Sequence, residues 1–151
     1  MQRIKQALYN RCLEFIEQRI QTAETALEQA REASNDDTKS SAGDKYETSR
    51  EMMQQDIDRN KRLLLDAQEN MRILKSVEIN TEKFDRVKHG SLVQTNQGLF
   101  YISVSAGHLV ADGTDVFAIS PASPIGKLML EKKKGDTFSF NGKDYTIKDF
   151  N

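Results

Sequence analysis

The sequence predicts an α+β protein in which an antiparallel two-helix coiled coil precedes a small antiparallel sheet with one short helix. Two observations lead to this fold class. Apolar residues recur at spacings of three and four in the first half, whereas apolar and polar residues alternate in the second half. Glycine and β-branched residues also become frequent after about residue 80. We therefore divide the chain into a helical hairpin, 1–78, and a sheet domain, 79–151.

The first predicted helix runs from Met1 to about Ser34. Its seam has the spacing of a coiled coil and consists of Leu13, Ile16, Ile20, Ala23, Leu27 and Ala30. A second apolar row widens this face near the start of the helix and consists of Ile4, Leu8, Cys12 and Phe15. A wider apolar face is expected where a helix packs on another domain. We expect Cys12 to be buried and unreactive, as free cysteines commonly are.

The second predicted helix runs from about Asp44 to Ser76. Its seam residues continue the same spacing and are Tyr46, Met53, Ile57, Leu64, Ala67, Met71 and Leu74. Arg50 and Asn60 occupy seam positions between them. If the turn centres near Lys39 or Ser40, Leu27 faces Met53 and Ile20 faces Asn60. We expect Asn60 to fix the register of the hairpin at some cost in stability.

The second half predicts five strands and one short helix. The strands are 91–96, 98–104, 115–120, 137–140 and 144–150. Asn141 and Gly142 join the last two, because both positions of a type I′ turn need a positive φ. A helix over 125–131 is expected to begin with Pro124 after Ser123. The pairs Gly107-His108 and Asp112-Gly113 indicate turns.

Composition and motifs exclude several classes of function. The 22 basic and 23 acidic residues give a net formal charge of −1, which does not support a strongly basic nucleic-acid binder. A single cysteine excludes an internal disulfide and fits a reducing compartment. The sequence has no apolar signal core near Met1, and no apolar run approaches the roughly 20 residues that span a bilayer. We expect a cytoplasmic protein without a membrane partner.

Candidate catalytic residues are scarce. His89 and His108 lack the spacing of a zinc site, so we expect both in loops or at the surface. No nucleophile elbow or phosphate-binding glycine loop is present. We therefore predict that the protein is not an enzyme. The basic run Lys132–Lys134 is either a solvated turn or a contact to a polymerase or a nucleic-acid backbone.

The segment from Ser123 to Asp136 resembles the signature of the Gre family of bacterial transcription elongation factors. It contains Ser-Pro, an apolar residue, a small residue, a leucine-rich helical turn and then Gly-Asp before a strand. The layout of a helical hairpin followed by a sheet domain is also similar to that family. The resemblance spans the whole chain in layout and about 116–150 in sequence.

The resemblance implies a function. In such factors a C-terminal domain of FKBP-like fold docks on RNA polymerase at the rim of its secondary channel, and the hairpin passes toward the active centre. Ser123, Pro124, Ile125 and Gly126 are then the candidates for polymerase docking. Acidic residues at the hairpin tip help to hold a catalytic Mg²⁺ while the polymerase cleaves its own backtracked transcript. We expect the protein to be a monomer that meets nucleic acid only through the polymerase.

The tip of the hairpin, 34–44, departs from the family pattern Asp-Leu-Ser-Glu-Asn-Ala-Glu-Tyr. Aligned on Tyr46, the chain matches at Ser41, but Lys39 and Ala42 stand at the two acidic positions. A lysine there opposes a second Mg²⁺, which favours a regulator that occupies the channel over a cleavage stimulator. Lys39 could instead approach a phosphate or an acidic polymerase residue.

Other acids lie near the tip. Asp36 and Asp37 are the candidates to hold a Mg²⁺ shared with the polymerase, provided that the first helix ends early and the loop bulges. The alternative is that both belong to a solvated helix exit. Asp44, with Glu47 three residues later, resembles a capping box at the start of the second helix.

Three functions therefore stay open. The first is an RNA polymerase-binding regulator of transcription elongation that inserts the hairpin into the secondary channel. The second is a cleavage stimulator that acts through Asp36 and Asp37. The third is a coiled-coil adaptor unrelated to transcription, for which the row Ile4, Leu8, Cys12 and Phe15 would supply the binding surface.

Overall fold

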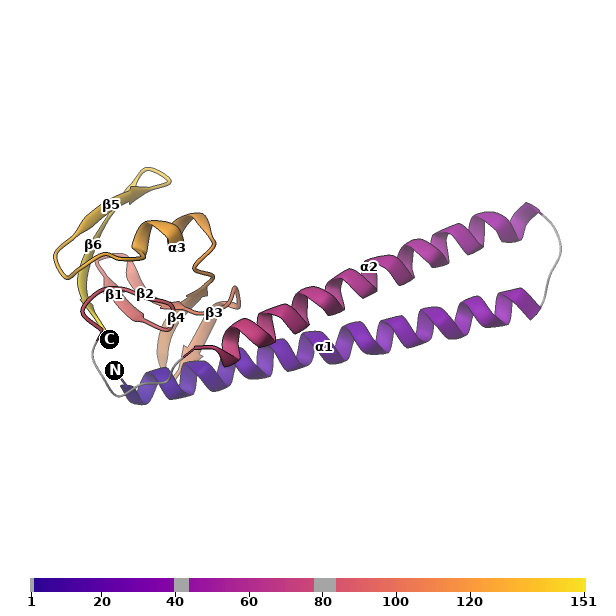
Figure 1. Cartoon of the computed structure of the whole chain (residues 1–151), viewed down its shortest axis with the longest axis horizontal. Coiled ribbons are helices and arrows are strands. Elements are labelled where there is room, and N and C mark those ends of the chain that lie inside the picture. Colours follow the sequence, from indigo (N-terminus) through magenta and orange to yellow (C-terminus); the bar gives the residue numbers. More distant parts are fainter. Residues whose placement is uncertain (1, 40–43, 78–83) are drawn as a thin grey trace. The chain divides into compact units, whose positions relative to one another are not determined.

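The protein is described by a computed structural model that covers residues 2–39, 44–77 and 84–151, with side chains from 4–33, 49–77 and 84–151 (Figure 1). The elements in chain order are α1 (Gln2–Lys39), α2 (Asp44–Lys75), β1 (Leu92–Thr95), β2 (Gly98–Ile102), β3 (Gly107–Ala111), β4 (Thr114–Ile119), α3 (Pro124–Met129), β5 (Thr137–Phe140) and β6 (Lys143–Phe150). Two long helices therefore precede a six-stranded sheet and a short helix, which confirms the predicted α+β class. None of the helices in the described ranges is long and apolar enough to cross a membrane.

Two compact units make up the chain. One comprises Ile16–Met71, and the other joins Met1–Phe15 to Arg72–Asn151. The first turns of α1 and the last turn of α2 thus belong with the sheet. We refer to these as the hairpin unit and the sheet unit.

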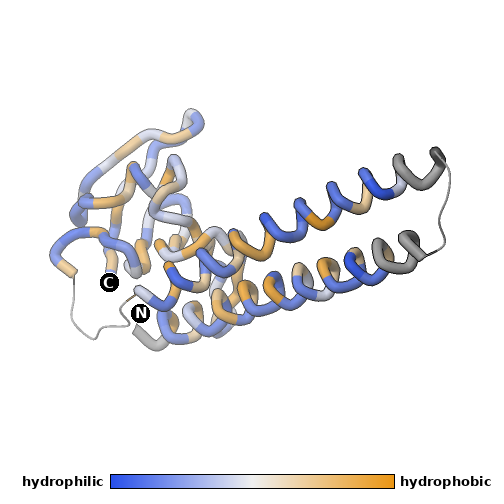
Figure 2. Tube along the Cα trace, turned by 45° about the vertical axis from the view of Figure 1, so that its right-hand side comes forward, coloured by the Kyte–Doolittle hydropathy of each residue, from blue (hydrophilic) through white to orange (hydrophobic). Residues whose placement is uncertain are grey.

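The hairpin unit is held by the apolar seam that the sequence predicts. Hydrophobic residues recur along both helices between hydrophilic ones (Figure 2). The buried seam residues of this unit are Ile16, Ala23, Leu27, Ile57, Asn60 and Ala67. Most other predicted seam positions with described side chains, including Ile20 and Leu64, are half-buried.

The helix ends differ from the expected ones at one point. The helix α1 continues to Lys39 instead of ending at Ser34, whereas α2 begins at Asp44 as predicted. The residues from Asn35 to Thr38 are only moderately poor helix formers, each costing a few tenths of a kcal/mol, and Lys39 is a good one, so they do not stop a helix. The first strong helix breaker along this stretch is Gly43.

The sheet has the strand order β3-β4-β2-β1-β6-β5. All neighbours are antiparallel except β2 and β4, which are parallel with Leu99 beside Val116. The expectation of a wholly antiparallel sheet was therefore wrong for this pair. Gly107 and His108 do not form the predicted turn but begin the additional strand β3. It is the hairpin partner of β4, and the positive φ values of Asp112 and Gly113 form the turn between them.

The core of the sheet unit lies on one face of the sheet beneath α3. Its buried members are Val87, Val93, Phe100, Ile102, Met129, Tyr145 and Ile147. Aromatic rings order part of this core, since Phe138 stacks on Tyr145 at 4.9 Å between centroids. Alternation along β4 places Val116 and Ala118 on the opposite face, where both are buried.

Candidate functional site

Ser123 shapes the corner between β4 and α3, which contains the docking candidates. Its Oγ accepts a hydrogen bond from the backbone N–H of Gly126 at 3.1 Å and donates one to the carbonyl oxygen of Ser120 at 2.6 Å. Ser123 is thus the N-cap of α3, and its extended φ and ψ of −66° and 155° are usual for a cap. Pro124 takes the first helical position, where the missing N–H has no cost.

Gly126 allows α3 to pack closely against this corner. A Cβ at this position would collide with the carbonyl oxygen of Ser120 and would lie 3.1 Å from Cα of Pro121. The φ of Gly126 is not in the left-handed region, so contact rather than backbone conformation requires glycine here. The small residue in the Ser-Pro-apolar-small pattern therefore has a packing reason in this protein.

The far end of the Ser123–Asp136 segment is fixed by a second set of hydrogen bonds. The backbone N–H of Glu131 donates to Val87, and the N–H of Val87 donates to Lys132, both at 2.9 Å. Asp136 accepts from the N–H of Lys133 at 2.8 Å through its carboxylate. Gly135 adopts a φ of 92° in this turn, a conformation that glycine reaches without strain. Both ends of the motif are therefore built into the sheet unit.

The four docking candidates differ in what they offer a partner. Pro124 is exposed, Ser123 and Ile125 are half-buried, and Gly126 is buried. Ile125 packs against the core of the sheet unit. Pro124 is therefore the docking candidate best placed to touch another molecule, and Ser123 and Gly126 hold the corner in shape.

The tip candidates fall where side chains are not described. The backbone of Asp36, Asp37 and Lys39 lies in the last turns of α1, and Asp44 begins α2. Ser41 lies outside the described residues. The condition attached to Asp36 and Asp37, an early end of the first helix, is not met because α1 continues to Lys39. The side chains of all five residues lie outside the described part of the chain.

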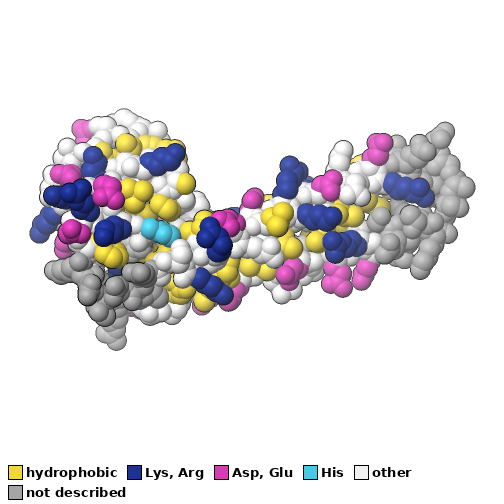
Figure 3. Space-filling view, viewed as in Figure 1, with side chains coloured by type: hydrophobic (Ala, Val, Ile, Leu, Met, Phe, Trp, Pro, Cys, Tyr) yellow, Lys and Arg dark blue, Asp and Glu magenta, His cyan; other side chains and the backbone are white. Residues whose placement is uncertain are grey.

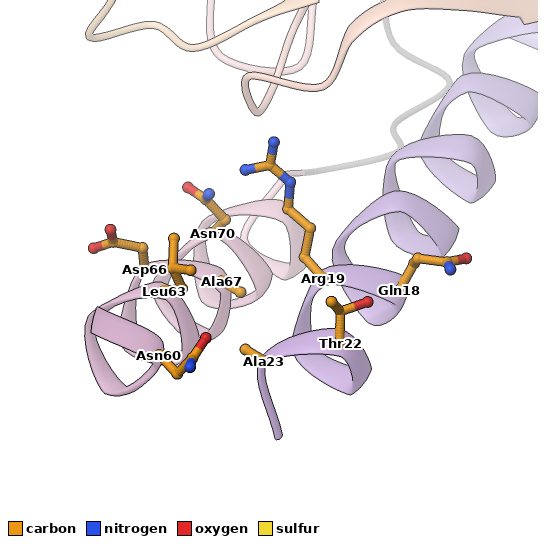
Figure 4. Close-up of a pocket in the computed structure, with 9 residues that line it drawn as sticks. All are labelled: Gln18, Arg19, Thr22, Ala23, Asn60, Leu63, Asp66, Ala67 and Asn70. Atoms are coloured by element: carbon orange, nitrogen blue, oxygen red, sulfur yellow. The ribbon is translucent and has the colours of Figure 1, made fainter. Parts of the chain in front are cut away.

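A cleft of about 340 Å³ lies between α1 and α2 in the hairpin unit (Figure 4). The small seam residues Ala23 and Ala67 leave this space, and polar side chains such as Gln18 and Asn70 line it. Asn60, only 9% exposed, donates from Nδ2 to the carbonyl oxygen of Asp56 in its own helix at 2.9 Å. Its Oδ1 points toward the gap between the helices in Figure 4.

The helix ends bear on the turn that the expected register assumed. Because α1 ends at Lys39 and α2 begins at Asp44, the midpoint between them falls past Ser40. Ala23 lines the cleft with Asn60, and Leu27 lines a second groove with Leu64. The pairing of Leu27 with Met53 and of Ile20 with Asn60 stays a prediction.

The first turns of α1 carry a buried polar cluster within the sheet unit. Nζ of Lys5 donates to the backbone oxygen of Asn151 at 2.8 Å and lies 4.9 Å from the ring centroid of Phe84. Burial lowers the pKa of Lys5 and raises the pKa of Cys12. Sequence reasoning missed Lys5, since nothing in its local pattern distinguishes it from an exposed helical lysine.

The two histidines have different surroundings. His108 is exposed on β3, and its Nε2 lies 2.8 Å from Oδ1 of Asp115. His89 is half-buried and its ring donates to the carbonyl oxygen of Ser103 at 3.2 Å, while burial lowers its pKa. Within the described ranges, no group of three His, Cys, Asp or Glu side chains is arranged to hold a metal ion.

Comparison of the chain with models of known protein families, with curated proteins and with solved structures finds no match.

Proposed function

We propose that this protein binds RNA polymerase and regulates transcription elongation by inserting its helical hairpin into the secondary channel. The proposal rests on the resemblance of the Ser123–Asp136 segment to the Gre signature and on the layout of the chain. The observation that carries it is the corner at Ser123. Its cap and the close packing of Gly126 give the residue types of the signature a definite shape that leaves Pro124 exposed.

The dimensions of the helices support the same proposal. With 38 residues in α1 and 32 in α2, a rise of 1.5 Å per residue gives lengths of about 57 and 48 Å. An antiparallel pair of such helices is a long and narrow element, which suits entry into a channel. A compact enzyme core does not need such an element.

The distribution of charge along the chain disfavours direct binding of nucleic acid by the hairpin. The range 16–71 contains 13 acidic and eight basic residues, a net formal charge of −5, and the remainder of the chain has a net charge of +4. An acidic hairpin is repelled by phosphates, so direct binding of RNA or DNA through it is unfavourable. We therefore propose contact with nucleic acid only through the polymerase.

Binding to core RNA polymerase tests the proposal, with purified protein in a native gel or by sedimentation. We expect a complex at micromolar concentration. The variant Pro124→Glu places an acid at an exposed first helical position that tolerates one, so it should weaken the complex without unfolding α3. Ser105→Glu adds the same charge at an exposed loop position after β2 and is the matched control. Absence of a complex with the unaltered protein would refute the proposal.

A photoreactive residue at position 41 tests insertion separately. If the hairpin enters the secondary channel, cross-links from this position should fall on polymerase segments near the active centre. Cross-links confined to the outer surface of the polymerase would show binding without insertion. The same group placed at Gln94 gives the background of random contacts.

Cleavage stimulation is the alternative within the same class. Adding the protein to a stalled, backtracked complex should then shorten the RNA, and the double change Asp36→Ala and Asp37→Ala should remove the effect. A polymerase that binds the protein but does not shorten its transcript excludes this alternative and leaves the regulator. Lys39 at an acidic position of the family pattern favours that second outcome.

The adaptor alternative loses the surface on which it depended. Leu8 and Cys12 are fully buried in the sheet unit, and Ile4 and Phe15 are half-buried. A partner cannot use this row without displacing the contacts of α1 with the sheet. We therefore place the adaptor last among the three functions.

A further inference from the structure

We propose that the outer edge of β3 binds an extended, basic segment of a partner protein as an added strand. The strand β3 is the first in the sheet order, so only β4 pairs with it. On its other side, no described residue donates to or accepts from its backbone. About half of the backbone N–H and C=O groups of an edge strand point outward, and a further strand satisfies them.

The edge at β3 lacks the features that usually block such pairing. Its sequence, Gly-His-Leu-Val-Ala, contains no proline, lysine or acid. The opposite edge, β5, differs, because Lys132–Lys134 precede it and Lys143 follows it. Natural sheets commonly protect edges with lysine or proline to prevent unwanted association. One edge of this sheet is therefore flanked by lysines, and no strand of the described residues covers the other.

Exposed apolar side chains beside the outer edge of β3 would be buried by an added strand. Val110 is 46% exposed and Phe117 is 45% exposed. The register places His108 beside Phe117 and Val110 beside Asp115, so all four side chains share one face of the sheet. In Figure 3, hydrophobic side chains reach the surface of the sheet unit beside a histidine. Alternate residues of an added strand would pack on Val110 and cover this face.

Charge specifies the partner more closely. The range 89–126 contains no lysine or arginine and two acids, Asp112 and Asp115. Both acids are exposed, and Asp115 stays accessible although it contacts His108. Asp115 lies on β4, one strand in from the edge, and its side chain shares a face with Val110. A lysine or arginine of the added strand on this face can lay its aliphatic stem over Val110 and bring its charge toward Asp115. A segment that alternates lysine or arginine on this face with apolar residues on the other therefore fits this edge best.

A second copy of the chain is a less suitable occupant. The β3 strand carries no lysine or arginine, so pairing of two β3 edges lacks the charge complementarity that a basic segment offers to Asp112 and Asp115. Pairing of β3 with the lysine-flanked β5 edge of another copy has such complementarity, but it is head-to-tail and generates an open chain of molecules. Both arrangements are visible in sedimentation of the free protein, which we expect to be monomeric.

Two fluorescent peptides test the proposal with the full chain. The first is a short peptide of alternating lysine and valine, and the second has the same sequence with methyl groups on alternate backbone nitrogens. We expect the first peptide to bind with fluorescence anisotropy that saturates, and the second to bind at least about tenfold more weakly, because methylation removes the donors of the added strand. A glutamate–valine peptide should not bind. Equal binding of the methylated peptide would overturn the proposal.

Matched variants locate the site. Val110→Lys places a basic residue on the edge and should weaken the lysine–valine peptide at least about tenfold. Leu128→Lys makes the same change at an exposed position of α3 and should leave binding unchanged. Unchanged binding to a folded Val110→Lys variant, checked by circular dichroism, would refute the site. A self-associating wild-type protein that becomes monomeric in Val110→Lys would assign the edge to a second copy and also refute it. The Val110→Lys variant should still bind RNA polymerase. Loss of peptide binding can then be distinguished from a failure of the proposed function.

Discussion

Sγ of Cys12 lies 3.6 Å from Oγ of Ser103, a contact that joins α1 to the end of β2 within the sheet unit. The neighbouring Tyr101 is also buried, and burial raises the pKa of its hydroxyl above the usual value. The first turns of α1 therefore form part of the sheet unit's core. This explains why the apolar face of the first helix is wider at its start than a two-helix seam requires.

Cys12 should react slowly with thiol reagents in the folded protein. Burial raises its pKa, so little thiolate is present at neutral pH, and the side chain has no exposed surface. We expect alkylation by iodoacetamide at pH 7.5 to be at least about tenfold slower in buffer than in denaturing urea, measured by mass spectrometry. Equal rates would show that the first turns of α1 separate readily from the sheet.

Gly126→Ala should destabilise the sheet unit by about 1–3 kcal/mol. The added Cβ would collide with the carbonyl oxygen of Ser120, which is backbone and cannot rotate away. Urea unfolding followed by circular dichroism measures the change. Lys127→Ala, an exposed substitution on the same helix, is the control and should stay within about 0.5 kcal/mol of the unaltered protein. A Gly126→Ala variant of unaltered stability would show that the corner moves easily.

The sequence was sufficient to predict the elements that have a clear local pattern. The hairpin seam at Ile16, Ala23 and Ile57 follows from spacing, and the turn at Asn141 and Gly142 follows from the need for positive φ. These features depend on residues close together along the chain, where propensity and periodicity act.

The features that were missed depend on partners distant in the sequence. The strand β3 is short and flanked by Gly107 and the Asp112-Gly113 turn, so its pattern resembles a loop until β4 pairs with it. The parallel contact of β2 with β4 is a matter of strand order, which local pattern does not determine. The candidate site likewise contains one feature that local sequence predicts and one that it does not. The Ser123 cap was predictable, whereas the collision that requires Gly126 depends on the path of the chain at Ser120.

Asn60→Leu should stabilise the hairpin unit by about 1 kcal/mol. An apolar side chain would replace a polar residue at this seam position and fill part of the cleft beside Ala23. Hydrogen exchange of amides in the hairpin unit measures the change. Gln68→Leu, at an exposed position of α2, is the control. A loss of protection in Asn60→Leu would mean that the hydrogen bond from Asn60 to Asp56 outweighs the gain from apolar packing.

Lys5 should give the protein an alkaline pH dependence of stability. Burial lowers the folded-state pKa of Lys5 below the value of 10.5 that we take for the unfolded chain. Between these two pKa values the unfolded state binds more protons than the folded state, so the contribution of Lys5 to the free energy of unfolding rises with pH. Below the folded-state pKa both states are protonated, and the full cost of burying the charge opposes folding.

Lys5→Met removes this titration and should flatten the rise. The free energy of unfolding should therefore be compared between wild type and variant at several pH values up to 10.5. The difference between them should shift in favour of wild type as pH increases through this window. Tyr101 has a raised pKa and acts in the opposite direction above pH 10, but it is common to both proteins and cancels in the difference. Lys75→Met, at an exposed position, should show no such shift. If the free energies of unfolding of wild type and Lys5→Met change in parallel with pH, the pKa of Lys5 is not lowered in the folded protein.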